Sequence, residues 1–137
     1  MANFVETEWV QDLYFESKID EQSIALDNTT MGNQHRGVGP KKLLLTALTG
    51  CTGMDVASIM ERKFKMPLVS FKVSAKATLT DVHPRIYDTI HLVYIVKLNP
   101  EFQEKFHEAI EMSITTYCGV HAMLSKSSEI THEVVFL

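Results

Sequence analysis

Hydrophobic and polar positions alternate in three short runs near the N-terminus. These runs read FVETEW, LYFESKI and SIAL, and short groups of acidic and amide residues separate them. Alternation over four to eight residues is typical of half-buried strands. The pattern therefore predicts three strands between Val5 and about Leu26. The next segment, DNTTMGNQHRGVG, has the glycine and asparagine content of a loop.

The loop is followed by an apolar run without charge, which extends from Leu43 to Met54. Pro40 suits a first helical turn, and the apolar spacing after it predicts a helix that ends near Phe64. The first half of this helix has almost no polar face. A helix that is apolar all round is buried in a core or against a partner.

Two glycines stand close to Cys51 within this predicted helix. Each helix-interior glycine costs about 1 kcal/mol relative to alanine, so Gly50 and Gly53 need a reason. In one interpretation they let another backbone pack closely, and Cys51 is a small buried hydrophobe. In the other, the missing side chains open a pocket onto the sulfur, lined by the hydroxyls of Thr49 and Thr52. The residues alone leave both interpretations open.

The C-terminal half begins with two long strands. SFKVSAKATLT alternates between apolar and polar residues, which predicts a half-buried strand. IYDTIHLVYIVKL is apolar on both faces, which predicts a central strand. A short helix in CGVHAMLSKS and a closing strand in EITHEVVFL complete the chain. With the helix described next, the predicted order is βββ-α-ββ-αα-β, an α+β fold in a single domain over residues 1–137.

A helix after the second long strand is predicted from its capping residues. Asn99 is a good N-cap, and Pro100 suits the first helical position. The apolar residues that follow fall on one side of the helix; they are Phe102, Phe106, Ala109, Ile110 and Tyr117.

Charge and targeting signals narrow the class of protein. The net charge is −4 and the basic residues are scattered, so no nucleic-acid-binding surface is expected. The N-terminus lacks the basic and apolar regions of a signal peptide. The uncharged run is too short and too rich in threonine and glycine to span a bilayer, so no membrane association is expected. We expect a cytoplasmic protein, where cysteines are more often reactive, metal-bound or buried than structural disulfides.

The second cysteine, Cys118, stands between two predicted helices, directly before Gly119. A thiol near a helix N-terminus is exposed to backbone N–H groups, which favour the thiolate. Cys118 and His121 have the spacing of half a zinc site. The chain has neither a second such pair nor an HExxH helix, so we expect no metal and no bound cofactor.

The two cysteine segments carry a family resemblance. GPKKLLLTALTGCTGMDVASIM, two long strands and then TYCGVHAMLSKS resemble the OsmC/Ohr family of thiol proteins that reduce organic hydroperoxides. TGCTGMDV is similar to the family's GGC-x-x-(M/I)-D-V-like segment. The resemblance implies an OsmC-like fold in an intertwined homodimer with central buried helices. It also implies that Cys51 is the peroxidatic thiol, that Cys118 resolves it, and that the protein acts in a stress response.

The resemblance implies partners as well. The substrate would be a small organic hydroperoxide, and an external dithiol, such as a lipoyl protein, would reduce the oxidised pair. An apolar pocket formed by Leu44, Leu48, Met54 and residues of the partner chain would suit an alkyl or fatty-acid hydroperoxide.

The chain departs from the family's enzymes at two charged positions. A glutamate typically stands ten residues before the first cysteine, where this chain has Lys41. Ten helical residues span about 15 Å, so that position is far from the thiol of its own helix. The arginine normally found between the first two strands is missing, and Arg36 is the candidate cation for Cys51. The match is therefore better to the broader OsmC-like branch than to its well-defined peroxidases.

Two functions of different class follow from these observations. The first is a thiol-dependent peroxidase that uses Cys51 and Cys118. The second is a non-catalytic OsmC-like dimer that binds a small apolar ligand in the same cleft. The distance between the two sulfur atoms and the charges around Cys51 distinguish them.

Overall fold

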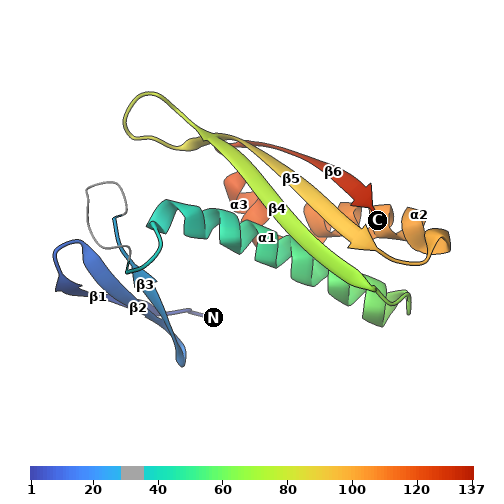
Figure 1. Cartoon of the computed structure of the whole chain (residues 1–137), viewed down its shortest axis with the longest axis horizontal. Coiled ribbons are helices and arrows are strands. Elements are labelled where there is room, and N and C mark those ends of the chain that lie inside the picture. Colours follow the sequence, from blue (N-terminus) through green and yellow to red (C-terminus); the bar gives the residue numbers. More distant parts are fainter. Residues whose placement is uncertain (29–35) are drawn as a thin grey trace. The chain divides into compact units, whose positions relative to one another are not determined.

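The computed structural model describes residues 1–28 and 36–137, which form two compact units, Met1–Thr46 and Ala47–Leu137. The main elements follow the order β1-β2-β3-α1-β4-β5-α2-α3-β6 (Figure 1). This is the predicted βββ-α-ββ-αα-β order, and it confirms the α+β class. The single domain over residues 1–137 stays a prediction.

The N-terminal unit contains an antiparallel sheet. Strands β1 (Val5–Gln11), β2 (Tyr14–Ile19) and β3 (Gln22–Leu26) pair in sequential order. Asp12 and Asp20 make the two turns with φ values of 51° and 54°, which aspartate tolerates better than most residues. Every residue of β1 is exposed in this chain. β1 is therefore an exposed edge strand of this sheet.

The C-terminal unit is built on a second, mixed sheet. Strand β4 (Ser70–Leu79) pairs antiparallel with β5 (Tyr87–Lys97), and β5 pairs in parallel with β6 (Glu129–Phe136). The central position predicted for β5 is confirmed. A parallel pair needs a crossover connection, and the helices between β5 and β6 supply it.

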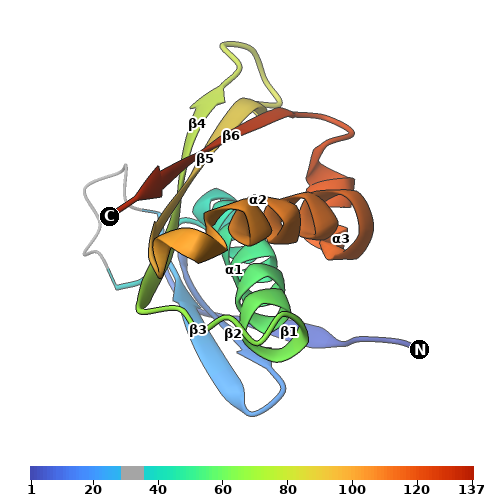
Figure 2. The same cartoon turned by 90° about the vertical axis from the view of Figure 1, so that its right-hand side faces the viewer.

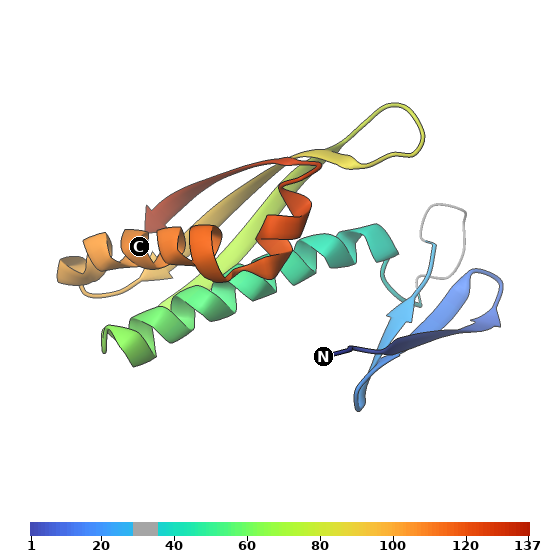
Figure 3. The same ribbon diagram turned by 180° about the vertical axis from the view of Figure 1, so that it is seen from behind.

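Helices cover one face of this second sheet. Helix α1 (Pro40–Ser58) continues as a π-helical turn, Ile59–Lys63. A 3₁₀ turn, Pro100–Phe102, leads into α2 (Gln103–Met112), a second π-helical turn (Ser113–Tyr117) and α3 (Gly119–Leu124). Within the C-terminal unit, α1 and α2 lie side by side on the same face of the sheet (Figures 2 and 3).

The capping prediction for the second long helix is confirmed. The prediction that Tyr117 shares the apolar face of this helix is wrong. Asn99 Oδ1 accepts a hydrogen bond from the backbone N–H of Glu101 at 3.0 Å. Phe106 is fully buried, yet the Tyr117 side chain is 55% exposed. The π-helical turn before Cys118 places more residues in each turn than an α-helix does, so the side chains after it rotate off the predicted face.

Helix α1 buries only one stripe of its apolar surface. Leu48, Thr52 and Val56 are fully buried at every fourth position, whereas Met54 is 76% exposed. Residues Pro40–Lys63 form a helical stretch that is long and apolar enough to cross a membrane by length and composition alone. The expectation of no membrane association stays a prediction. The central helix of a globular assembly has the same length and composition. Apolar surface of α1 therefore remains uncovered within the C-terminal unit.

Candidate functional site

The structure brings together the two cysteines that were predicted to form the site. The sulfur atoms of Cys51 and Cys118 and a carboxylate oxygen of Asp55 all lie within 4.8 Å of one another. Both cysteines are free thiols. Cys51 is half-buried on α1. Cys118 is buried, and its own backbone is extended between the second π-helical turn and α3. A disulfide requires an S–S distance of about 2.05 Å, so the two side chains must move closer on oxidation.

Asp55 is a site residue that the sequence analysis missed. It stands four residues after Cys51 on α1, and side chains four apart share one face of a helix. It is also the one charged residue between Lys42 and Glu61. This spacing from a cysteine, in a stretch of helix that is otherwise uncharged from Leu43 to Met60, was the available sequence signal.

Three buried hydroxyl groups hold Asp55 in place. Ser113 Oγ donates to Asp55 Oδ2 at 2.9 Å, and Ser113 Oγ lies 2.9 Å from Thr52 Oγ1. Thr52 Oγ1 lies 2.8 Å from the Tyr94 hydroxyl. Because a carboxylate only accepts, the order of donation runs from Tyr94 through Thr52 and Ser113 to Asp55. This series of hydrogen bonds connects Asp55 to β5 and to the second π-helical turn.

Burial makes Cys118 a weak acid. Its side chain is 3% exposed, and this burial, with a hydrogen bond to Cys51, raises its pKa to about 11. The negative charges of Cys51 and Asp55 act in the same direction. The backbone N–H of His121 donates to the Cys118 sulfur at 3.3 Å and opposes the rise. The expected preference for thiolate at this helix N-terminus is therefore wrong, because burial outweighs the backbone N–H.

The high pKa of Cys118 predicts a loss of stability at alkaline pH. Below about pH 9 both the folded and the unfolded chain keep this proton, and between pH 9 and 11 only the unfolded chain loses it. The free energy of unfolding therefore falls as the pH rises through this window, by at most about 3 kcal/mol from this group.

Urea unfolding of the reduced protein at pH 8 and pH 10.5 measures this loss. Cys118→Ala is the matched variant, because it leaves the other groups that titrate above pH 9 in place. A loss of equal size in the wild type and the variant would contradict the raised pKa.

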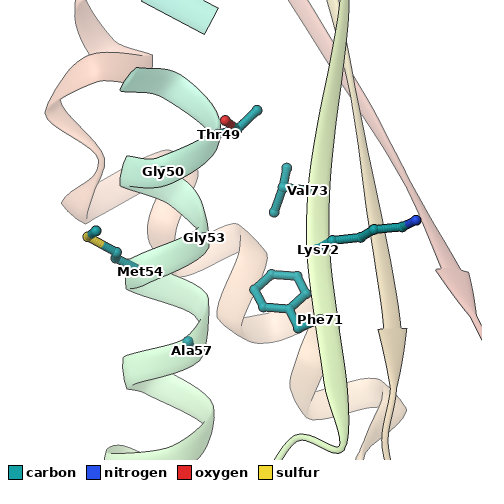
Figure 4. Close-up of a pocket in the computed structure, with 8 residues that line it drawn as sticks. All are labelled: Thr49, Gly50, Gly53, Met54, Ala57, Phe71, Lys72 and Val73. Carbon is teal, nitrogen blue, oxygen red and sulfur yellow. The ribbon is translucent and has the colours of Figure 1, made fainter. Parts of the chain in front are cut away.

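The two glycines of α1 open a groove toward β4 and not toward the sulfur. A β-carbon added at Gly50 would meet nothing within 4 Å, and one at Gly53 would lie 3.6 Å from a methyl group of Val73. The groove encloses about 340 Å³ (Figure 4). Its lining consists of Thr49, Gly50, Gly53, Met54, Ala57, Phe71, Lys72 and Val73. Thr49 and Thr52 were both expected to line a pocket. Thr49 lines this groove, whereas the hydroxyl of Thr52 takes part in the buried hydrogen bonds with Tyr94 and Ser113.

Asp55, which has an oxygen within 4.8 Å of both sulfur atoms, also lines a second hollow. This hollow encloses about 380 Å³ and is lined by Asp55, Ser58, Ile59, Arg62, Lys63 and Tyr117. Its wall combines apolar surface with two cations. Leu48, which was expected to line an apolar pocket, is fully buried in the core. The pocket that would include residues of a partner chain stays a prediction.

Arg36 is engaged by acidic partners within the N-terminal unit. Its Nε atom lies 2.9 Å from Asp27 Oδ2, and a terminal nitrogen lies 3.6 Å from Asp12 Oδ2. Its guanidinium also stands over the ring of Tyr14 at 4.9 Å. The hydrogen bond from Arg36 holds the pKa of Asp27 below its usual range. The role of Arg36 as the cation beside Cys51 stays a prediction.

The thiols and the carboxylate are also donor types found in metal sites. Structural zinc sites use four protein ligands. Among the residues that the structure describes, this group offers three ligands, one fewer than a structural zinc site. The absence of a bound metal stays a prediction.

Comparisons with known proteins agree with the fold. The chain is 28% identical to Protein YhfA of Escherichia coli (strain K12) over 124 residues, which cover 90% of each chain. A hypothetical protein from Aquifex aeolicus VF5 matches with a TM-score of 0.83 and 26% identity, over 100% of this chain and 98% of that one.

An organic hydroperoxide resistance protein from Elizabethkingia anophelis shares the fold, with a TM-score of 0.74 and 12% identity over 100% of this chain and 99% of that one. The family model described as OsmC-like protein matches residues 32–133, which include both cysteines. The chain therefore belongs to the OsmC-like protein family.

Proposed function

We propose that this chain is a thiol-dependent peroxidase that reduces organic hydroperoxides. The observation that carries the proposal is the approach of two free thiols, Cys51 and Cys118, to within 4.8 Å. Cys118 keeps its proton at neutral pH, which suits a resolving thiol. The shared fold with a protein named for hydroperoxide resistance supports the same reaction.

The reaction proceeds in three balanced steps. The sulfur of Cys51 attacks the distal peroxide oxygen, the O–O bond breaks, and the alcohol leaves while Cys51 becomes a sulfenic acid. The thiol of Cys118 then attacks this sulfur, which forms a disulfide and releases water. Finally an external dithiol, such as a lipoyl group, reduces the disulfide and becomes oxidised itself. No bound cofactor takes part.

The hollow beside Asp55 suits the organic part of the substrate. Ile59 and the ring of Tyr117 offer apolar contacts, and Arg62 and Lys63 offer positive charge at its rim. A disulfide that an external dithiol must reduce in every cycle suits a reducing compartment, so the proposal includes a cytoplasmic location. Its physiological role in this proposal is the response to peroxide stress.

Turnover with a dithiol tests the proposed function. Purified protein is mixed with cumene hydroperoxide and dihydrolipoamide, and peroxide loss is followed against a mock without protein. We expect multiple turnovers with the dithiol and slower turnover with a monothiol. If the protein consumes no peroxide with any thiol but binds the hydroperoxide or an apolar analogue, the chain is the non-catalytic binding dimer.

We further propose that the protein is an intertwined homodimer whose partner covers α1. Met54 is 76% exposed in this chain although it lies on an apolar helix. Met54→Glu is expected to shift the protein from dimer to monomer at micromolar concentration, because the new charge would be buried in a core-like interface.

Light scattering measures this shift, and Val82→Glu is the control, since Val82 is 73% exposed in the turn between β4 and β5. A folded wild-type monomer at micromolar concentration would contradict the dimer.

Arg36 is our proposed cation for the peroxide step. Arg36→Gln removes the charge, and we expect Cys51 oxidation to slow about tenfold or more, because a cation stabilises both the thiolate and the leaving alkoxide. Stopped-flow oxidation of the reduced protein gives the rate. Arg85→Gln, at an exposed arginine of the C-terminal unit, is the control. Equal rates in the two variants would leave Arg36 as a residue that only stabilises the N-terminal unit.

A further inference from the structure

The carboxylate of Asp55 lies at the place where the resolving step must move a proton. One of its oxygens is within 4.8 Å of both sulfur atoms, and Ser113 Oγ donates a hydrogen bond to its Oδ2. One bridging water, or a small rotation of the side chain, brings such a pair into proton-transfer range. The hydrogen-bonded chain from Tyr94 fixes this position from inside the core.

We propose that Asp55 is the general base of the resolving step, an inference that rests on the proposed function. As the Cys118 sulfur attacks the Cys51 sulfenic acid, Asp55 takes the Cys118 proton. The S–S bond forms, the S–O bond breaks, and Asp55 returns the proton to the departing hydroxide, which leaves as water. The carboxylate is thus regenerated in every cycle.

The burial of Cys118 explains why a base is needed here. With a pKa of about 11, roughly one thiol in ten thousand is ionised at pH 7. A base that removes the proton during the attack avoids this prior ionisation. The same site thereby keeps Cys118 inert toward peroxide and still able to resolve Cys51.

Other charged and titratable groups around Cys118 are weaker candidates. The imidazole of His121 is the main rival. Burial and the charge of His132 lower its pKa, which makes it a weaker base than an ordinary histidine. Among the described residues, its ring does not belong to the group that lies within 4.8 Å of both sulfur atoms. Glu111, on α2, is exposed. Tyr94 keeps its proton, because burial raises its pKa. Asp55 is the carboxylate that the described residues place with both sulfur atoms.

Asp55→Asn tests the proposal in the full-length reduced protein. One equivalent of cumene hydroperoxide is added, samples are quenched in acid over time, and intact mass separates the sulfenic acid from the disulfide. We expect the variant to gain one oxygen but to form the disulfide about a hundredfold more slowly or worse at pH 7. Its disulfide rate should rise about tenfold for each pH unit from 6 to 8, whereas the wild-type rate changes little.

The control variants separate this role from a structural one. Glu111→Gln should behave like the wild type, and Asp55→Glu should recover part of the rate. If Asp55→Asn forms the disulfide as fast as the wild type, or if His121→Gln shows the loss instead, the proposal is wrong.

Two further outcomes are distinguishable. If Asp55→Asn does not fold, the wild-type profile decides, because a tenfold rise per pH unit in the wild type excludes a base. A wild type that gains no oxygen at all contradicts the proposed peroxidase, whereas unchanged resolution in the variant contradicts only Asp55.

Discussion

Cys51→Ser is expected to consume no organic hydroperoxide, whereas Cys118→Ser is expected to react once in each site. A serine hydroxyl at neutral pH is a far poorer nucleophile than a thiolate, so the first variant cannot attack the peroxide. The second variant retains Cys51 and reaches the sulfenic acid. Without its resolving thiol it stalls there and proceeds to the sulfinic acid when peroxide is in excess.

Intact mass after one equivalent of cumene hydroperoxide distinguishes these outcomes. We expect an unchanged mass for Cys51→Ser, a gain of one oxygen for Cys118→Ser, and a loss of two hydrogens for the wild type. Both sulfur atoms already lie within 4.8 Å, so the wild-type disulfide needs only local movement. Equal behaviour of the two variants would contradict the assigned roles. An unmodified wild type would favour the binding protein.

Much of the fold could be predicted because short-range patterns determine it. Alternation identified β4, and apolar residues on both faces placed β5 at the centre of its sheet, where Ile90, Leu92 and Tyr94 are fully buried. Asn99 and Pro100 marked the start of the next helix because capping is a local interaction. These signals lie within one element, so a single sequence is sufficient to interpret them.

The polar contacts of the site could not be predicted because they join distant elements. Thr52 on α1 contacts Tyr94 on β5 and Ser113 in a π-helical turn, and no pattern within any one element indicates these partners. The raised pKa of Cys118 likewise depends on burial by the surrounding fold. The sequence suggested a thiolate at Cys118 because its place at a helix N-terminus is the one effect on its pKa that the sequence reveals. Asp55 is present in the sequence, but its proposed role as a base could be inferred only from the residues that the fold places around it.

Phe106→Ala is expected to give the largest loss of stability in the C-terminal unit. The Phe106 ring is fully buried and makes edge contacts with Phe71 at 5.5 Å and with Phe136 at 6.0 Å between ring centroids. It thereby joins α2 to strands β4 and β6. Truncation removes these contacts and leaves a cavity, which costs about 3–5 kcal/mol. This is a large fraction of the roughly 5–15 kcal/mol that stabilises a typical domain.

The loss should also reach the thiols, because α2 leads directly into Ser113 and Cys118. Thermal unfolding is expected to shift downward by on the order of 10 °C. At a temperature where the variant is still folded, its disulfide should form more slowly than that of the wild type, while Cys51 oxidises at a similar rate. Val82→Ala, at an exposed apolar residue of the β4–β5 turn, controls for loss of side-chain volume. A Phe106→Ala protein as stable as this control would show that α2 is not held by its aromatic contacts.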